Sequence, residues 1–150
     1  MKKQIALLFI LSLGLFVGIA SAQEDSGRPV SATLTGAAEV PGPGDTDGTG
    51  TATIRLNQGK KQVCFDLTVS NIATATAAHI HRGATTVAGP VVVTLTAPAT
   101  GTSTGCVDNV SVELIKEIRQ TPEKFYVNVH NAAFQNGAIR GQLEKGIDKP

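Results

Sequence analysis

The chain is poor in aromatic and basic side chains. It has no tryptophan, one tyrosine and five phenylalanines, and its 13 lysines and arginines never form more than a pair. Nucleic-acid binding is therefore disfavoured, because phosphates need basic patches and bases need rings on which to stack. Paired catalytic carboxylates, phosphate-binding loops and zinc-protease motifs are also missing. These absences favour a protein that is not an enzyme.

One long apolar run is present, and it lies at the N-terminus. Two lysines precede the apolar stretch 5–19, and Ala20-Ser21-Ala22 has the form of a cleavage site. We predict a signal peptide over residues 1–22, a flexible leader over 23–29 and a secreted protein, extracellular or periplasmic. Since no second apolar run follows, no membrane association is expected after cleavage.

The two cysteines of the chain are Cys64 and Cys106. In an exported protein such a pair is a disulfide by default. The bridge would close a loop of about 43 residues, for which the chain-entropy model gives about 4 kcal/mol. The alternatives, a redox pair or metal-binding thiolates, lack the C-x-x-C spacing. We predict a structural disulfide.

Alternation of apolar and polar residues with a period of two dominates the rest of the chain. It predicts strands at 30–35, 51–57, 63–69, 78–83, 91–96, 125–131 and 139–143. One segment changes to helical spacing, near 112–120, with Ser111 as N-cap and Pro122 as a stop signal. Short strands at regular spacing favour an all-β fold, an immunoglobulin-like antiparallel β-sandwich with one short crossover helix, over residues 30–145.

Residues 98–105 are rich in glycine and threonine and are predicted to form a loop. The segment 101–105 formally matches the nucleophile motif G-x-S-x-G. That motif functions at a strand–turn–helix in a large α/β sheet. We attribute the match to chance and assign no catalytic residue.

The three histidines fall in two strand-like motifs. His79 and His81 are two residues apart, as are Tyr126, Asn128 and His130, so each set points to one face of its strand. If the two strands are neighbours, the three imidazoles meet at one polar patch. An H-x-H pair with a third histidine suits copper or zinc and leaves a coordination position open.

An alternative for His79, His81 and His130 is structural: they hydrogen-bond Tyr126, Asn128, Arg140 or backbone groups and join strands. The pattern is loosely similar to that of copper–zinc superoxide dismutase, another β-sandwich with an H-x-H strand. The two-metal site of that enzyme needs more histidines than this chain has, so dismutase chemistry is not expected.

The order of motifs resembles that of the CHRD domain, named from chordin and found in many bacterial secreted proteins. The matching segments are 34–41 (L-T-G-A-A-E-V-P), 78–81 (A-H-I-H) with 89–92, and 125–130 (F-Y-V-N-V-H) with 137–143. Gly42 and Ala138 depart from the pattern, which often has proline and an acidic residue there. The resemblance spans residues 30–144 and implies an all-β, immunoglobulin-like module.

Glu39 and Arg140 lie in these matched motifs and carry opposite charges. We predict an ion pair between them that fixes the first loop to the last strand. Ligand capture by Arg140 is the alternative, because guanidinium groups bind anions in two-point geometry.

Two functions follow from these residues. The first is a secreted binding or adhesion module without catalytic activity, whose partner is an extracellular protein or a small ligand. The second is a small extracytoplasmic metal-binding protein in which His79, His81 and His130 hold copper or zinc, with redox or hydrolytic activity as a further option.

Overall fold

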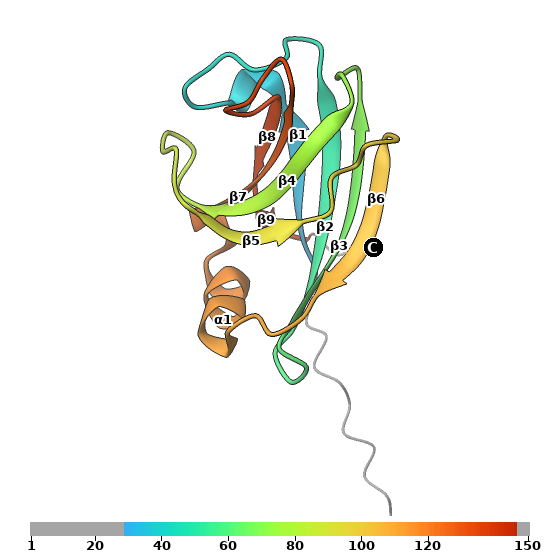
Figure 1. Ribbon diagram of the computed structural model, residues 1–150. Helices are drawn as coiled ribbons and strands as arrows, with labels where there is room; N and C mark the ends of the chain where they lie inside the picture. The colour runs from blue at the N-terminus through green and yellow to red at the C-terminus, as the bar shows by residue number, and fades with distance from the viewer. Residues whose placement is uncertain (1–28, 147–150) are drawn as a thin grey trace, which may run out of the picture.

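The computed structural model of the protein describes residues 29–146, so the predicted signal peptide and all but the last residue of the predicted leader lie outside the described residues. Within this range most of the regular secondary structure is β-strand (Figure 1). The strands are β1 Val30–Thr35, β2 Thr49–Asn57, β3 Gln62–Ser70, β4 Ala75–Arg82, β5 Val91–Leu95, β6 Thr102–Val107, β7 Phe125–Asn131, β8 Ile139–Gln142 and β9 Glu144–Lys145. The helical segments are η1 Gly36–Ala38, α1 Val112–Gln120 and η2 Pro122–Lys124.

The described strands form one antiparallel sheet in the order β5-β4-β7-β8-β1-β2-β3-β6, with β9 beside β1. The sheet curls until its end strands β5 and β6 contact each other, which gives a near-barrel (Figure 1). The β1–β8 junction between its two halves has a single paired position, Thr35 with Arg140.

The immunoglobulin-like sandwich is therefore not confirmed, whereas the all-β antiparallel class with one short helix is. Alternation along a strand indicates which side chains share a face. It does not indicate that two halves of a fold pair edge to edge. The sequence periodicity was thus compatible with both arrangements.

Apolar side chains that alternate along the strands fill the inside of the near-barrel. Leu34, Ile54, Phe65, Ile80 and Val127 are each at most 2 % exposed. They belong to one continuous buried cluster that draws on both halves of the sheet. Burial of this apolar area is the main favourable term in folding.

Helix α1 has the position and the N-cap residue that were predicted from the sequence. The Ser111 hydroxyl accepts a hydrogen bond from the Leu114 N–H at 3.1 Å, as N-cap side chains do. Ile115 and Ile118 are fully buried, and the chain leaves the helix just before Pro122. In Figure 1 the helix lies at the end of the near-barrel away from η1. No helix among residues 29–146 is long and apolar enough to cross a membrane.

The predicted disulfide is confirmed and joins two neighbouring strands. Cys64 on β3 lies directly opposite Cys106 on β6, and their sulfur atoms are 2.05 Å apart.

The prediction of a loop over residues 98–105 is wrong for its last four residues, because strand β6 begins at Thr102. Small and polar residues hide this strand from sequence analysis: Gly105 lies over the ring of Phe65, where a Cβ would be 3.1 Å from the ring. The segment 101–105 is thus mostly strand and not a nucleophile elbow.

Candidate metal centre

Strands β4, β7 and β8 have one apolar and one polar face. Val127 and Val129 point into the core, so the residues between them point outward. We call the outward set the polar layer: His79, His81, Tyr126, Asn128, His130, Arg140 and Gln142. The strand register sets its rows, with Asn128 between Arg140 and His79 in one row. The sequence-predicted histidines, Tyr126, Asn128 and Arg140 are therefore brought together as side-chain neighbours.

The three histidines form one cluster within this layer. One ring nitrogen from each of His79, His81 and His130 lies within 4.8 Å of the other two. His79 Nδ1 is 3.1 Å from His130 Nε2, a hydrogen-bond distance. The ring centroids of His79 and His81 are 5.5 Å apart. A metal ion needs its ligand atoms about 3–4 Å apart, so small side-chain movements suffice to bring them into range.

Backbone carbonyls fix the protonation of two of these rings. His81 Nδ1 is 2.9 Å from the Gly89 carbonyl oxygen, and His130 Nδ1 is 3.0 Å from that of Gln135. A carbonyl only accepts, so each Nδ1 carries the proton and each neutral ring has its lone pair on Nε2. The Nε2 of His81 is buried and has no hydrogen-bond partner. It is a lone pair without a hydrogen-bond partner on a ring of the cluster.

All three imidazoles favour the neutral form. Burial lowers the pKa of His79 to about 4, with further lowering by the neighbouring His130 and His81. Burial is also the largest cause of the lowered pKa of His81 and of His130. A metal binds only a neutral ring, and all three rings are neutral at neutral pH. His79 Nδ1 donates to the lone pair of His130 Nε2, so it can bind a metal only after its proton moves to His79 Nε2.

Arg140 and Tyr126 pack against the cluster. The Arg140 guanidinium lies over the Tyr126 ring, 3.4 Å from its centroid, and the His81 ring stacks on the same tyrosine at 4.8 Å. Arg140 is 1 % exposed and donates hydrogen bonds to the carbonyls of Ala84 and Val87. Its guanidinium thus donates to loop carbonyls, and the charge of Glu39 attracts it as well.

No hydrogen bond joins Glu39 to Arg140 among the described residues, but their charges attract each other, so the predicted ion pair remains a prediction. Glu39 Oε2 accepts a hydrogen bond from Asn128 Nδ2 at 3.0 Å, and Oε1 is buried without a partner. The guanidinium is held by the 83–90 loop, which the sequence could not place. Burial raises the pKa of Glu39 to about 7, against the lowering effects of Asn128 and of the Arg140 charge.

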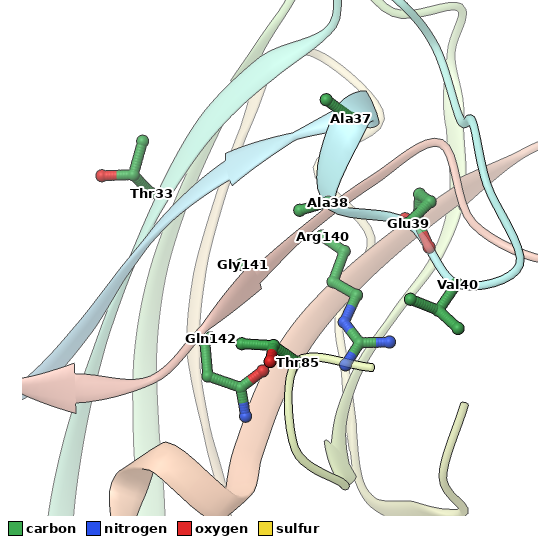
Figure 2. Close-up of a pocket in the computed structure, with 9 residues that line it drawn as sticks. All are labelled: Thr33, Ala37, Ala38, Glu39, Val40, Thr85, Arg140, Gly141 and Gln142. Carbon is green, nitrogen blue, oxygen red and sulfur yellow. The ribbon is translucent and has the colours of Figure 1, made fainter. Parts of the chain in front are cut away.

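A cavity of about 280 Å³ lies beside the polar layer, over β8 (Figure 2). Its polar lining residues include Glu39, Arg140 and Gln142, and Thr85 faces them from the 83–90 loop. The rest of its lining comes from β1, η1, Val40 and Gly141, and no histidine is among the lining residues.

Sequence analysis missed the loop residues that orient the cluster. Gly89 and Gln135 act through their carbonyl oxygens, and a backbone carbonyl carries no mark in a sequence. A Cβ on Gly89 would lie 1.7 Å from the Arg82 carbonyl oxygen, so only glycine fits there. The Gly89-Pro90 dipeptide, within a matched motif, was the one available signal.

These features define a class: an all-β near-barrel module with a buried polar layer and a histidine cluster on its outer face. The sequence model of the CHRD domain matches residues 30–143, and the chain belongs to the CHRD domain family. The resemblance stated from the motifs is thereby confirmed. Neither a curated protein nor a solved structure matches the chain.

Proposed function

We propose that this CHRD-family chain is an exported metal-binding module in which His79, His81 and His130 hold copper or zinc. The observation that carries the proposal is the pair of Nε2 lone pairs created by the carbonyls of Gly89 and Gln135. The buried, unpartnered Nε2 of His81 adds to it, because such an atom is costly unless it has a ligand.

The donor set agrees with these two metals. Three neutral imidazoles without sulfur or carboxylate suit zinc and copper and leave a further position for water or another ligand. Divalent copper is expected to bind more tightly, following the usual order of affinities. The hydrogen bonds to Gly89 and Gln135 are of the kind that orients metal-ligating histidines in other proteins.

A binding or adhesion role without catalysis is the second proposal. The cavity of about 280 Å³ beside the polar layer favours it, because polar groups line an open space there. The occupant of the cavity would be a small ligand or a protruding side chain of an extracellular protein. The two proposals share one surface and are compatible with each other.

Metal titration tests the first proposal. Wild type should bind Cu²⁺ saturably at micromolar concentration in calorimetry, and Zn²⁺ more weakly. His130→Ala should weaken binding by about 100-fold while two ligands remain on β4. Thr94→Ala is the matched control, since Thr94 lies opposite His79 on β5 and supplies no nitrogen. Absence of saturable binding by wild type would refute the metal proposal.

Export is the other part of the proposal. Family membership and the A-x-A site at Ala20–Ala22 support a secreted location. Mass spectrometry of protein recovered outside the cytoplasm should give a chain that begins at Gln23. A full-length chain retained in the cytoplasm would contradict export.

A further inference from the structure

We propose that Tyr126 and Arg140 are positioning residues for the metal centre: they hold the His81 ring so that its Nε2 faces His79 and His130. The proposal rests on the proposed metal binding and deepens it. It is carried by a three-layer stack of flat groups and by a loop that the same residues anchor.

The stack runs across three neighbouring strands. The His81 ring lies parallel to the Tyr126 ring, with 10° between their planes and 4.8 Å between their centroids. The Arg140 guanidinium lies 3.4 Å from the same centroid. Because β7 lies between β4 and β8, and because both groups cannot occupy one face of the ring, they pack on opposite faces. The tyrosine is thus held between a cation and a metal-ligand candidate.

One loop residue ties the tyrosine and the histidine to the same point. The Gly89 N–H donates to the Tyr126 hydroxyl at 3.0 Å, and the Gly89 carbonyl accepts from His81 Nδ1 at 2.9 Å. Any rotation of the His81 ring therefore loses both its stack and its hydrogen bond. A ring restrained in two ways presents its free nitrogen in one direction only.

The same loop is held to the sheet at further points. Arg140 donates to the carbonyls of Ala84 and Val87, and Gln142 donates to that of Gly83 at 2.7 Å. These bonds fix residues 83–89 over the polar layer and so place the Gly89 carbonyl. Arg140 acts on His81 along two routes, through the tyrosine ring and through the loop.

The arrangement also explains how a cation is held at a buried position. Arg140 is 1 % exposed, and desolvation by burial lowers its pKa. The attraction of the Tyr126 ring for a cation over its face offsets part of this cost. Burial of a guanidinium costs desolvation free energy, so arginine suits such a position where a planar group with several fixed hydrogen-bond donors is needed. Lysine does not supply a planar group of this kind.

Two tyrosine variants separate stacking from simple packing. Tyr126→Leu removes the flat ring and the hydroxyl, whereas Tyr126→Phe keeps the ring and both stacked partners. We expect Tyr126→Leu to weaken Cu²⁺ binding by about 10- to 100-fold, in the range of groups that orient metal ligands. Tyr126→Phe should weaken it by less than this range, about 2- to 5-fold, because both stacked partners remain. Electron paramagnetic resonance with less than one equivalent of Cu²⁺ should show three coupled nitrogens in wild type and Tyr126→Phe and two in Tyr126→Leu.

A measurement on wild type keeps the test independent of variant folding. Long-range ¹H–¹⁵N spectra of the metal-free protein at pH 7 should show His81 with its proton on Nδ1. A proton on His81 Nε2 would overturn the proposal. So would a folded Tyr126→Leu variant that binds Cu²⁺ through three nitrogens with wild-type affinity, and in that case the metal site itself stands. No Cu²⁺ binding by wild type would remove the metal proposal together with this one.

Discussion

The two faces of strand β7 are both buried, but for different reasons. Val127 and Val129, on the inner face, are fully buried within the near-barrel. Tyr126 and Asn128, on the outer face, are only 2 % and 3 % exposed although they point away from the core. Loops cover the outer face, and their carbonyls receive its hydrogen bonds. Side chains on the inner face are thus buried by the curved sheet itself, and those on the outer face are buried by loops that cover it.

The difference has an energetic consequence. Inner side chains need only apolar contact, whereas each buried polar atom of the outer layer needs a partner. Four of the five buried side-chain nitrogen and oxygen atoms without a partner, among the described residues, lie in the polar layer or beside it: Glu39 Oε1, His81 Nε2, Asn128 Oδ1 and Gln142 Oε1. The fifth, Asn131 Nδ2, lies at the end of β7, where strand alternation puts it with the inner-face positions. The inner face is therefore built for stability, and the outer face carries groups that are available for a ligand.

The largest effect is expected from a cavity in the inner face. Ile54→Ala, at a fully buried position of β2, should lower the free energy of unfolding by about 2–5 kcal/mol. Chemical denaturation followed by circular dichroism measures this, since the chain has no tryptophan. Thr51→Ala, at an exposed position of the same strand, is the control and should change stability by less than about 0.5 kcal/mol. Equal effects of the two variants would mean that burial does not distinguish these positions.

Reduction of the disulfide is a second way to distinguish the two regions. It joins β3 and β6, in the half of the sheet that lacks the polar layer. Reduction should lower the free energy of unfolding by about 2–4 kcal/mol and leave Cu²⁺ affinity unchanged. The double variant Cys64→Ser/Cys106→Ser should match the reduced protein and no longer respond to reductant. A large loss of metal affinity on reduction would show that the two halves are coupled.

The inner face could be predicted from the sequence, and the reason is periodicity. Ile54, Phe65 and Val127 alternate with polar neighbours, and that pattern indicates a buried strand face without knowledge of its partners. The N-cap at Ser111 was predictable because capping is local in the chain. The joining of the two halves of the sheet through Thr35 and Arg140 was not, since pairing of distant edges leaves no periodic signal.

For the outer face, the sequence predicted which residues belong to it but not which groups they contact. Period-two spacing placed His79 with His81, and Asn128 with His130, correctly on shared faces. The partners of these side chains are loop carbonyls, which every residue has and which no pattern marks. For this reason charge alone indicated Glu39 as a partner of Arg140, whereas nothing in the sequence indicated the carbonyls of Ala84 and Val87, which accept hydrogen bonds from the guanidinium.

The smallest predicted effect concerns Glu39, the carboxyl group at the edge of the polar layer. Burial raises its pKa to about 7 in the folded protein, above the usual value of 4.5. Between these two pH values the folded state holds a proton that the unfolded state has lost, so stability falls as pH rises through about 7.

Glu39→Gln removes this ionisation. The variant should therefore equal wild type within about 1 kcal/mol at pH 5 and exceed it by about 1–3 kcal/mol at pH 8.5. Denaturation at both pH values measures the difference, with Glu144→Gln as the matched variant at an exposed carboxyl group. A Glu39→Gln effect of the same size at pH 5 and pH 8.5 would contradict a buried carboxyl that titrates near neutrality, and the outer face would then have to be as well satisfied as the inner one.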